Sequence, residues 1–458
     1  MVYRTEETKA ALMYLLRRGV TLIVGLCFAF LWTEYYSVLI INPFFRKGNW
    51  AVIVLYFVLY HLFTTLYGGY KIGSQRLTDI VYSNWLSLFI VNSVTYLQIS
   101  LIGRKFMPFG LFVLVTFLQI LLILLWANFA NRIYFRLFDP KKLLFFYGNE
   151  YPANVIDKFK ARPEEFSLSQ IKKISSCDEA ADISLSDVYG AVICDLPEER
   201  SAAILQLCLD RGIRCYVIPS LADILLRTTE IIYLFDIPLL MAKNEGLHMG
   251  QRFFKRLFDI FCSVFLIVLF LPVMLIVSLC IKLYDSGPVL YRQQRCTQHG
   301  RRFNIIKFRS MKVDAEKDGV ARLAEENDPR ITPVGRVIRK YRMDELPQLF
   351  NILQGDMSFV GPRPERPEMI EQYKKTLPEF DCRLSVKSGL TGYAQVIGRY
   401  NTTPEEKLKL DLIYIQSYSL LQDFKILLMT IKSVLSKESA TGIQGTADRA
   451  AMREEKDK

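Results

Sequence analysis

Long apolar runs dominate the start of this 458-residue chain, at roughly positions 20–41, 50–67, 80–102 and 109–130. Each run is close to the ~20 residues that a helix needs to cross a bilayer. Trp32, Trp50 and Trp126 lie near run ends, where the membrane–water interface favours aromatic rings. Buried helices of a large soluble bundle would be the alternative, but charged residues are nearly absent inside the runs. We therefore predict a membrane α-helical bundle of four spanning helices at 1–140.

Basic residues predict the orientation of this bundle. They gather before the first run, in the second loop and after the fourth run, as Arg4, Lys9, Arg17, Arg18, Lys71, Arg76, Arg132, Arg136, Lys141 and Lys142. Loops on the cytoplasmic side carry such an excess of Lys and Arg, so both ends of the bundle are expected in the cytoplasm. The formal net charge of +12 suits a membrane surface or phosphorylated substrates, and the apolar runs favour these over nucleic acid.

Residues 141–245 show the pattern of a Rossmann-like cytoplasmic α/β module. Short apolar runs at 143–147, 190–195 and 214–219 predict strands, and residues 198–211 predict a helix that ends before Gly212. The order strand, helix, strand with short connecting segments indicates a parallel sheet. Gly148 stands alone after the first strand, so the GxGxxG loop that cradles a dinucleotide phosphate is missing. We expect a structural or regulatory role for the module, with nucleotide binding as the alternative.

A fifth apolar run, at 260–281, is interrupted by Pro272. As one straight helix it would rise about 33 Å and would be able to span the membrane. Pro272 removes a backbone donor near the middle, which kinks a helix, and each arm alone would be too short to cross. Two interpretations compete: a kinked span, or a hairpin that enters the membrane and returns to the same side. The long charged stretch that follows contains no later spanning run, and only a re-entrant helix at 254–283 keeps it in the cytoplasm.

Basic residues concentrate again between positions 292 and 312, around the sequence FNIIKFRSM. Strand alternation would put Lys307 and Arg309 on one face, with Ile306 and Phe308 on the other. Two cations on one face can hold a diphosphate, because Arg binds phosphate through its fork and Lys as a point charge. A solvated basic face near anionic lipid would explain the pattern equally well.

An acidic pair, Asp344 and Glu345, lies in the sequence RMDELPQLFN. Pro347 is tolerated only in the first turn of a helix, which places Asp344 near the N-cap and Glu345 just inside. The positive end of the helix would attract a phosphoryl group there, and a divalent cation could bridge carboxylate and phosphate oxygens. The alternative for an isolated Asp-Glu dipeptide is simple N-capping by Asp344 with a solvent-facing Glu345.

Two further segments add cations to this region. In GDMSFVGPRPE, Pro362 and Pro364 bracket Arg363 and pre-set its guanidinium for phosphate recognition. In KSGLTGYAQVIGRY, the glycines permit tight turns and Arg399 adds a positive charge. Each segment alone is weak evidence for a phosphate-binding site.

Together these motifs produce a resemblance that extends from about residue 251 to 437. The stretch resembles the bacterial sugar transferase family, the polyprenyl-phosphate hexose-1-phosphate transferases. The resemblance rests on KRLFDI with the apolar run after it, KFRSM, DPRITPVGRVIRKYRMDELPQLFNILQGDMSFVGPRPE, SGLTGYAQVIGRY and LDLIYIQSYSLLQDFKIL. The whole layout is similar to that of the large monotopic phosphoglycosyl transferases. Ser388 departs from the pattern, because the family usually has proline before Gly389.

The resemblance implies a fold, a reaction and a set of site residues. It implies an α+β catalytic domain at 246–436 with a re-entrant membrane hairpin broken at Pro272. It implies that Asp344 attacks the β-phosphate of a UDP-sugar and that Asp344 and Glu345 bind Mg²⁺. The expected substrate-binding residues are Lys307, Arg309, Arg363 and Arg399. A phosphosugar-aspartyl intermediate would then pass its hexose-1-phosphate to undecaprenyl phosphate after release of UMP, initiating exopolysaccharide, capsule or O-antigen synthesis.

These expectations place the protein in the bacterial inner (cytoplasmic) membrane, as a multi-pass protein with its catalytic domain on the cytoplasmic side. The expected partners are a UDP-sugar, undecaprenyl phosphate and membrane lipid, with no nucleic acid, and a homo-oligomer is left open. The polar end of the chain, 437–458, is expected to be a disordered tail. One alternative is a non-enzymatic membrane regulator that senses a nucleotide, which the missing glycine loop argues against. Another is a polytopic transporter, which would need charged pairs inside the runs.

Overall fold

The protein folds into two compact units, Met1–Ser220 and Leu221–Lys458. The computed structural model describes residues 2–40, 44, 46–148, 151–176, 188–227, 229–241, 246–313, 315, 328–398 and 402–435. Arg399 and the polar tail 437–458 lie outside the described residues. Within the described part of the chain, five helices are long and apolar enough to cross a membrane, judged by length and composition.

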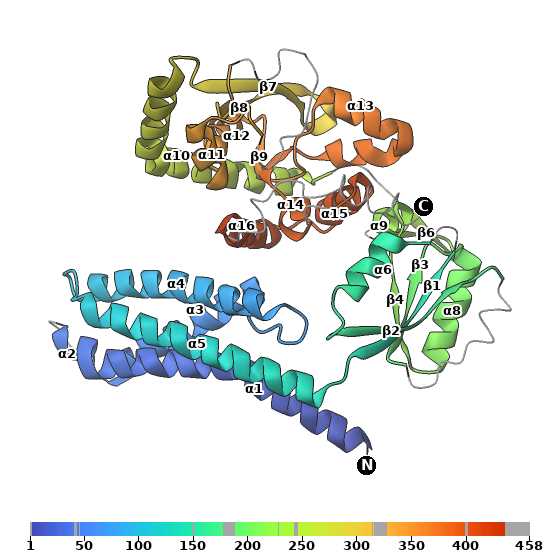
Figure 1. Ribbon diagram of the computed structural model, residues 1–458, viewed down its shortest axis with the longest axis horizontal. Helices are drawn as coiled ribbons and strands as arrows, with labels where there is room; N and C mark the ends of the chain where they lie inside the picture. Colours follow the sequence, from blue (N-terminus) through green and yellow to red (C-terminus); the bar gives the residue numbers. More distant parts are fainter. Residues whose placement is uncertain are drawn as a thin grey trace. The chain divides into compact units, whose positions relative to one another are not determined.

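Four long helices begin the first unit: α1 (Val2–Leu31), α3 (Arg46–Tyr67), α4 (Leu77–Ile102) and α5 (Gly110–Leu137). A π-helical turn (Trp32–Tyr36) and the short α2 (Ser37–Leu39) extend α1. Both α1 and α4 pack on α3 and α5, so the four helices lie side by side (Figure 1). The predicted apolar runs fall on these helices. α1 begins well before its run, because good helix formers such as Glu, Lys and Ala precede the apolar residues.

A chain of neutral polar side chains links the four helices. Tyr56 donates its hydroxyl hydrogen to Asn92 Oδ1 (2.7 Å). Asn92 Nδ2 donates to Thr116 Oγ1 (2.9 Å) and to Gln119 Oε1 (3.0 Å), and Gln119 Nε2 donates to the carbonyl of Val24 (3.0 Å). Such side-chain bonds commonly join helices where water is excluded.

The rest of the first unit is a parallel α/β module. Its strand order is β2-β1-β3-β4, built from β1 (Lys141–Tyr147), β2 (Phe166–Lys173), β3 (Gly190–Cys194) and β4 (Arg214–Val217). Helix α6 (Ala153–Lys160) covers one face, where Ile156 packs with Phe145, and α8 (Glu198–Asp210) covers the other, where Ile204 packs with Phe146 (Figure 1). The predicted parallel sheet is confirmed. β2 was not predicted from the sequence, because polar residues obscure its strand pattern.

The second unit mixes helices with short sheets. Its helices are α9 (Leu221–Leu226), α10 (Met249–Asp285), α11 (Pro333–Lys340), α12 (Gln348–Gln354), α13 (Pro367–Thr376), α14 (Tyr393–Ile397), α15 (Pro404–Gln416) and α16 (Leu420–Leu435). Its strands are β5 (Glu230–Leu234), β6 (Ile237–Met241), β7 (Leu290–Cys296), β8 (Arg302–Phe308), β9 (Ser358–Val360) and β10 (Gly389–Thr391). β5–β6 and β7–β8 are antiparallel hairpins, and β9–β10 is a parallel pair. Ile352, Phe359 and Leu408 belong to one core that joins α12, β9 and α15.

Helix α9 belongs to the second unit, although its residues lie in the stretch 141–245 that was predicted to form the α/β module. Ile224 is buried in the same core as Leu247 and Leu412. A short apolar helix is stabilised by burying its apolar surface in any core that the chain can bring it to. Here that core includes α15, so the position of α9 in the sequence does not predict the unit to which it belongs.

The longest helix, α10, has 37 residues and holds Pro272 inside it. Figure 1 shows α10 as two arms that meet at a bend. A proline within a helix removes one backbone hydrogen bond and commonly causes such a bend. Large apolar side chains are exposed along both arms, among them Phe261, Phe265, Leu275 and Leu279. An exposed apolar surface of this kind marks contact with a membrane or a partner.

Candidate active site

The acidic pair lies in a 3-10 turn directly before α12. The turn spans Met343–Glu345, and Pro347 immediately precedes the first residue of α12. Arg342, just before the turn, has a left-handed backbone (φ 55°), which redirects the chain from α11 into the pair. The sequence predicted Asp344 near the N-cap of a helix and Glu345 just inside it, whereas the structure places a tighter turn there and begins the α-helix after the proline.

Three cations converge on Glu345. Lys307 Nζ on β8 and Arg363 Nη2 each donate to Glu345 Oε1 at 3.0 Å, and Arg342 Nη1 lies 3.8 Å from the same oxygen. The Glu345 side chain is only 12% exposed, whereas that of Arg363 is 42% exposed, so the guanidinium can also reach a ligand. The structure thus brings the predicted residues Lys307 and Arg363 together at the acidic pair. We call Asp344, Glu345, Lys307, Arg342 and Arg363 the site cluster.

The two carboxyl groups of the pair have opposite pKa shifts. Burial raises the pKa of Glu345, but the attraction of Lys307, Arg363 and Arg342 outweighs it and holds this pKa well below its usual range. Burial, and then the negative charge of Glu345, raise the pKa of Asp344 above its usual value. Glu345 is therefore a firmly ionised residue that gathers cations, and Asp344 is the more basic carboxylate.

One oxygen of Asp344 stands without a partner. Its Oδ1 atom is buried and makes no hydrogen bond to any residue that the structure describes. A buried polar atom without a partner costs free energy, so it commonly indicates a place for a ligand or an ion. Arg309 Nη1 and Gln348 Nε2 are likewise buried and without hydrogen-bond partners in the described part of the chain.

Arg309 and Lys307 have different acidic partners. Strand β8 ends at Phe308, and Arg309 follows it directly. The Arg309 guanidinium pairs with Asp285 at the end of α10, and its backbone N–H donates to the carbonyl of Val289 (2.9 Å). The two cations therefore contact different carboxylates, and their joint binding of a diphosphate stays a prediction. A contact between Arg309 and substrate stays a prediction, as does the role of Arg399, which lies outside the described residues.

Residues that the sequence analysis did not single out also shape the site. Arg342 lies three residues before Glu345, the spacing at which opposite charges meet on a helical turn, so this signal was present in the sequence. Asn351 fastens α12 to β8, because its Nδ2 donates to the carbonyl of Asn304 (2.9 Å) and its Oδ1 accepts from the backbone N–H of Ile306 (3.0 Å). No local pattern predicts this long-range contact.

A second group of buried charges fastens α10 to the rest of the unit. Lys255 Nζ donates to Asp423 Oδ2 (2.5 Å) and to Tyr414 Oη (3.2 Å), and Tyr414 Oη donates to Asp423 Oδ1 (2.7 Å). Asp259 Oδ1 accepts from Ser358 Oγ and from a backbone amide of β9, both at 3.0 Å. We call Lys255, Asp259, Ser358, Tyr414 and Asp423 the anchor cluster.

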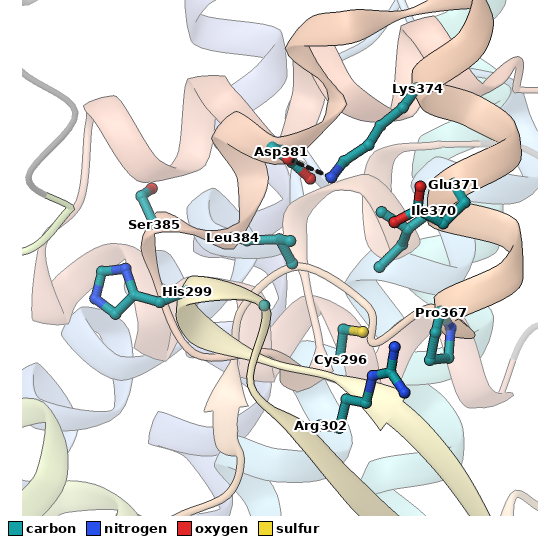
Figure 2. Close-up of a pocket in the computed structure, with 11 residues that line it drawn as sticks. Cys296, His299, Arg302, Pro367, Ile370, Glu371, Lys374, Asp381, Leu384 and Ser385 are labelled. Carbon is teal, nitrogen blue, oxygen red and sulfur yellow. Dashed lines mark ion pairs between the residues drawn. The ribbon is translucent and has the colours of Figure 1, made fainter.

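A pocket of about 370 Å³ lies at the turn end of the β7–β8 hairpin. Cys296 and Arg302, which face each other across the hairpin, line it together with Lys374 of α13. Figure 2 shows the ion pair between Lys374 and Asp381 at its edge. Lys307 lies five positions further along β8 than Arg302 (307 − 302), which is about 17 Å in a strand. The pocket is therefore separate from the site cluster.

Comparison with known proteins identifies the family of the second unit. The pattern of the bacterial sugar transferase family matches residues 250–437, which include the site cluster and the anchor cluster. The UDP-N-acetylgalactosamine-undecaprenyl-phosphate N-acetylgalactosaminephosphotransferase of Aeromonas hydrophila is 37% identical over 255 residues, which cover 54% of this chain and 59% of the relative. The undecaprenyl-phosphate galactose phosphotransferase of Salmonella typhimurium is 38% identical over 240 residues, which cover 49% of this chain and 50% of the relative.

A third relative is matched over most of its length. The UDP-glucose:undecaprenyl-phosphate glucose-1-phosphate transferase of Caulobacter vibrioides is 41% identical over 191 residues, 41% of this chain and 71% of the relative. The chain spans only about half to 59% of the Salmonella and Aeromonas proteins. Because the family pattern covers the unit that holds the acidic pair, and a 41% identical relative is matched over 71% of its length, this chain belongs to the bacterial sugar transferase family.

Proposed function

We propose that this protein transfers a hexose-1-phosphate from a UDP-sugar to undecaprenyl phosphate and so initiates synthesis of an exopolysaccharide, a capsule or an O-antigen. The observation that carries the proposal is the buried, unpartnered Oδ1 of Asp344 beside Glu345, an ionised residue that gathers three cations, within the described part of the chain. The names of the relatives give the reaction class and differ in the sugar, so the proposed donor is a UDP-hexose as a class.

Asp344 is the nucleophile in this mechanism. One of its carboxylate oxygens attacks the β-phosphorus of the UDP-sugar, the bond from that phosphorus to the bridging oxygen breaks, and UMP leaves with the bridging oxygen. A phosphate oxygen of undecaprenyl phosphate then attacks the same phosphorus, and the bond to Asp344 breaks to regenerate the carboxylate. The raised pKa of Asp344 supports this role, because the more basic carboxylate of the pair is the better nucleophile.

Lys307 and Arg363 bind the donor diphosphate in this proposal. Both contact Glu345 at 3.0 Å, so Glu345 holds them in place before the substrate arrives. Lys carries three donor hydrogens and Arg five, which leaves donors of both side chains available for phosphate oxygens. Cations that are already positioned stabilise the charge that develops on the departing phosphate without further reorganisation.

The site residues also fit Mg²⁺. The unpartnered Oδ1 of Asp344 offers an oxygen ligand, and Mg²⁺ in proteins commonly binds one or two carboxylates together with substrate phosphates. Mg²⁺ held by Asp344 and Glu345 would neutralise charge on the donor diphosphate. We expect EDTA to stop UMP release and added Mg²⁺ to restore it. Activity that survives thorough chelation would contradict this part of the proposal.

We further propose that α10 is a re-entrant hairpin and that the second unit lies on the cytoplasmic side of the bacterial inner membrane. Near the start of α10, Lys255 is bonded to Asp423 of α16. Near its end, Ile281 is buried with Phe308 and Ile338. A straight helix of 37 residues would separate its ends by about 55 Å. Contact of both ends with one compact unit therefore supports a return to the same side of the membrane.

Cysteine labelling tests this topology. Single cysteines introduced near positions 250 and 290, in a variant without other reactive cysteines, should react with an impermeant reagent from the same, cytoplasmic side. Labelling from opposite sides would show a true span. Pro272→Leu restores the missing backbone donor, so it should shift the segment toward spanning and change the labelling near 290.

Release of UMP tests the function itself. The purified full chain should release UMP and form a lipid-linked diphosphate sugar when it is given undecaprenyl phosphate and one of several UDP-hexoses. Mass analysis of the lipid product would identify the sugar. The relatives' names do not favour the alternative of a non-enzymatic nucleotide sensor, and that alternative predicts nucleotide binding without UMP release.

A further inference from the structure

The loop that carries Arg363 is fixed by its own backbone carbonyls. Four consecutive carbonyls each accept a hydrogen bond from another segment: Pro362 O from Gly389 N (2.9 Å), Arg363 O from Arg383 Nη2 (3.0 Å), Pro364 O from Arg295 Nη1 (3.2 Å) and Glu365 O from Cys296 N (3.0 Å). Two of the four donors are guanidinium groups. A loop bonded in this way has little freedom left to lose when a ligand binds.

Close backbone contact holds the start of the loop. Gly361, directly after β9, closely approaches Gly389, the first residue of β10: a Cβ atom on Gly389 would lie 2.1 Å from the backbone nitrogen of Gly361. Only glycine permits this approach. The loop therefore leaves the sheet from a fixed position.

The donor to the Arg363 carbonyl is itself held by a buried carboxylate. Arg383 donates to Asp411 Oδ2 through Nε (2.9 Å), and its Nη2 lies 2.7 Å from the same oxygen. Arg383 is 4% exposed and Asp411 is 1% exposed. Asp411 belongs to α15, so the pair connects the Arg363 loop to a helix in the core of the unit. The two flanking prolines restrict the backbone near Arg363, and the bond from Arg383 selects one orientation of its peptide group.

We propose that Arg383 and Asp411 are positioning residues for Arg363. They touch neither donor nor acceptor, but they fix the backbone from which the Arg363 guanidinium reaches Glu345 and the donor diphosphate. The inference rests on the proposed function, because Arg383 and Asp411 can position a substrate-binding group only if Arg363 binds a nucleotide sugar. A buried ion pair adds little net stability in many proteins. Orientation of the Arg363 loop is therefore a better explanation for the Arg383–Asp411 pair than stability of the fold.

A double-mutant cycle on UMP release from a UDP-hexose tests the proposal. Asp411→Asn keeps the size of the side chain but removes the charge that holds Arg383. We expect it to raise the KM for the donor by roughly tenfold, the scale of one charge-assisted hydrogen bond, with little change in the KM for undecaprenyl phosphate. In an Arg363→Ala background the same substitution should change the donor KM by less than about twofold, because the group that it positions is gone.

Two further variants make the result decisive. Asp381→Asn breaks an ion pair with Lys374 in the segment next to Arg383 and should leave the donor KM unchanged in both backgrounds. If Asp411→Asn does not fold, Arg383→Lys enters the same cycle, since it keeps the charge and loses the fork. An equal loss in both backgrounds would show a structural role and overturn the inference while the proposed function stands. A wild-type protein that releases no UMP would overturn both.

Discussion

The site cluster and the anchor cluster are both groups of buried charges in the second unit, but they differ in how their carboxylates are bonded. In the anchor cluster, the two oxygens of Asp423 are bonded to Lys255 and Tyr414. In the site cluster, Oδ1 of Asp344 has no hydrogen-bond partner among the described residues. An unpaired buried carboxylate destabilises a fold, whereas a fully bonded one can hold two helices together.

The difference separates two uses of buried charge in one unit. Removing a member of a fully bonded pair leaves the other charge uncompensated, so stability should suffer first. Replacing an incompletely bonded carboxylate removes an unfavourable group from the folded state, so stability should hold while chemistry is lost. Substitutions in the two clusters should therefore change different measured properties, which makes the comparison testable.

The largest expected effect is on turnover. Asp344→Asn should reduce UMP release by at least about 10³-fold, because the nucleophile is removed. The folded-state pKa of Asp344 is raised, so its ionisation costs stability as pH rises above the unfolded-state value, and at pH 7 the variant should melt no lower than the wild type. Initial rates and a melting curve of the purified variant check both statements. Near-normal turnover would end the assignment of Asp344 as nucleophile.

The next effect is on stability. Lys255→Met should destabilise the protein by ~3–5 kcal/mol, because it leaves Asp423 buried without its cation. Chemical unfolding in detergent measures this difference. The matched control is Lys374→Met, whose partner Asp381 is half exposed, and it should cost less than about 1 kcal/mol. Equal stability of the two variants would remove the distinction between the anchor cluster and an ordinary surface pair.

A smaller effect is expected at the donor-binding cation. Arg363→Ala should weaken donor use by about 1.5–3 kcal/mol, the range of a hydrogen bond to a charged group. Arg363→Lys should restore only part of this loss, because a point charge cannot reproduce the fork. The kcat/KM for the donor, compared among the three proteins, measures both effects. If Arg363→Ala behaves like the wild type, Lys307 must carry the diphosphate without it.

The smallest effect is a displacement along the pH axis. Burial and Glu345 raise the pKa of Asp344, and Lys307 lowers it. Turnover should rise with pH through this pKa, because attack requires the ionised carboxylate. Lys307→Met should therefore raise the pKa of Asp344. In the pH profile of the remaining kcat, the rise on the acidic side (the acid limb) should move to higher pH. The exposed Lys312→Met serves as control and should leave the limb in place, and a limb that moves to lower pH would contradict the electrostatics of the site cluster.

The sequence was sufficient to predict the parts of the fold that depend on local pattern. Apolar runs predicted the four helices of the first unit, and short apolar stretches predicted β1, β3 and β4, because hydrophobic periodicity reflects burial directly. β2 was not predicted, since its polar residues alternate with few apolar ones. Ile224 of α9 shows a second reason why a prediction from the sequence can fail. The core that buries Ile224 is formed by residues far along the chain, including Leu412.

The same limit applies to the site. The sequence pointed to Asp344, Glu345, Lys307 and Arg363, and the structure brings these four together. Arg309, directly after β8, pairs with Asp285 at the end of α10, a partner that no local pattern in the sequence predicts. Arg383 and Asp411 are 28 residues apart, and no local spacing predicts that they meet behind the Arg363 loop.

Detection of the covalent intermediate tests the central claim most directly. The full-length protein is mixed with a UDP-hexose and Mg²⁺ in the absence of undecaprenyl phosphate, and then examined by intact-protein and peptide mass analysis. We predict one hexose-phosphate adduct on Asp344, released UMP in equal amount, and loss of the adduct when undecaprenyl phosphate is added. UMP release without any adduct, or an adduct that persists in Asp344→Asn, would contradict the account.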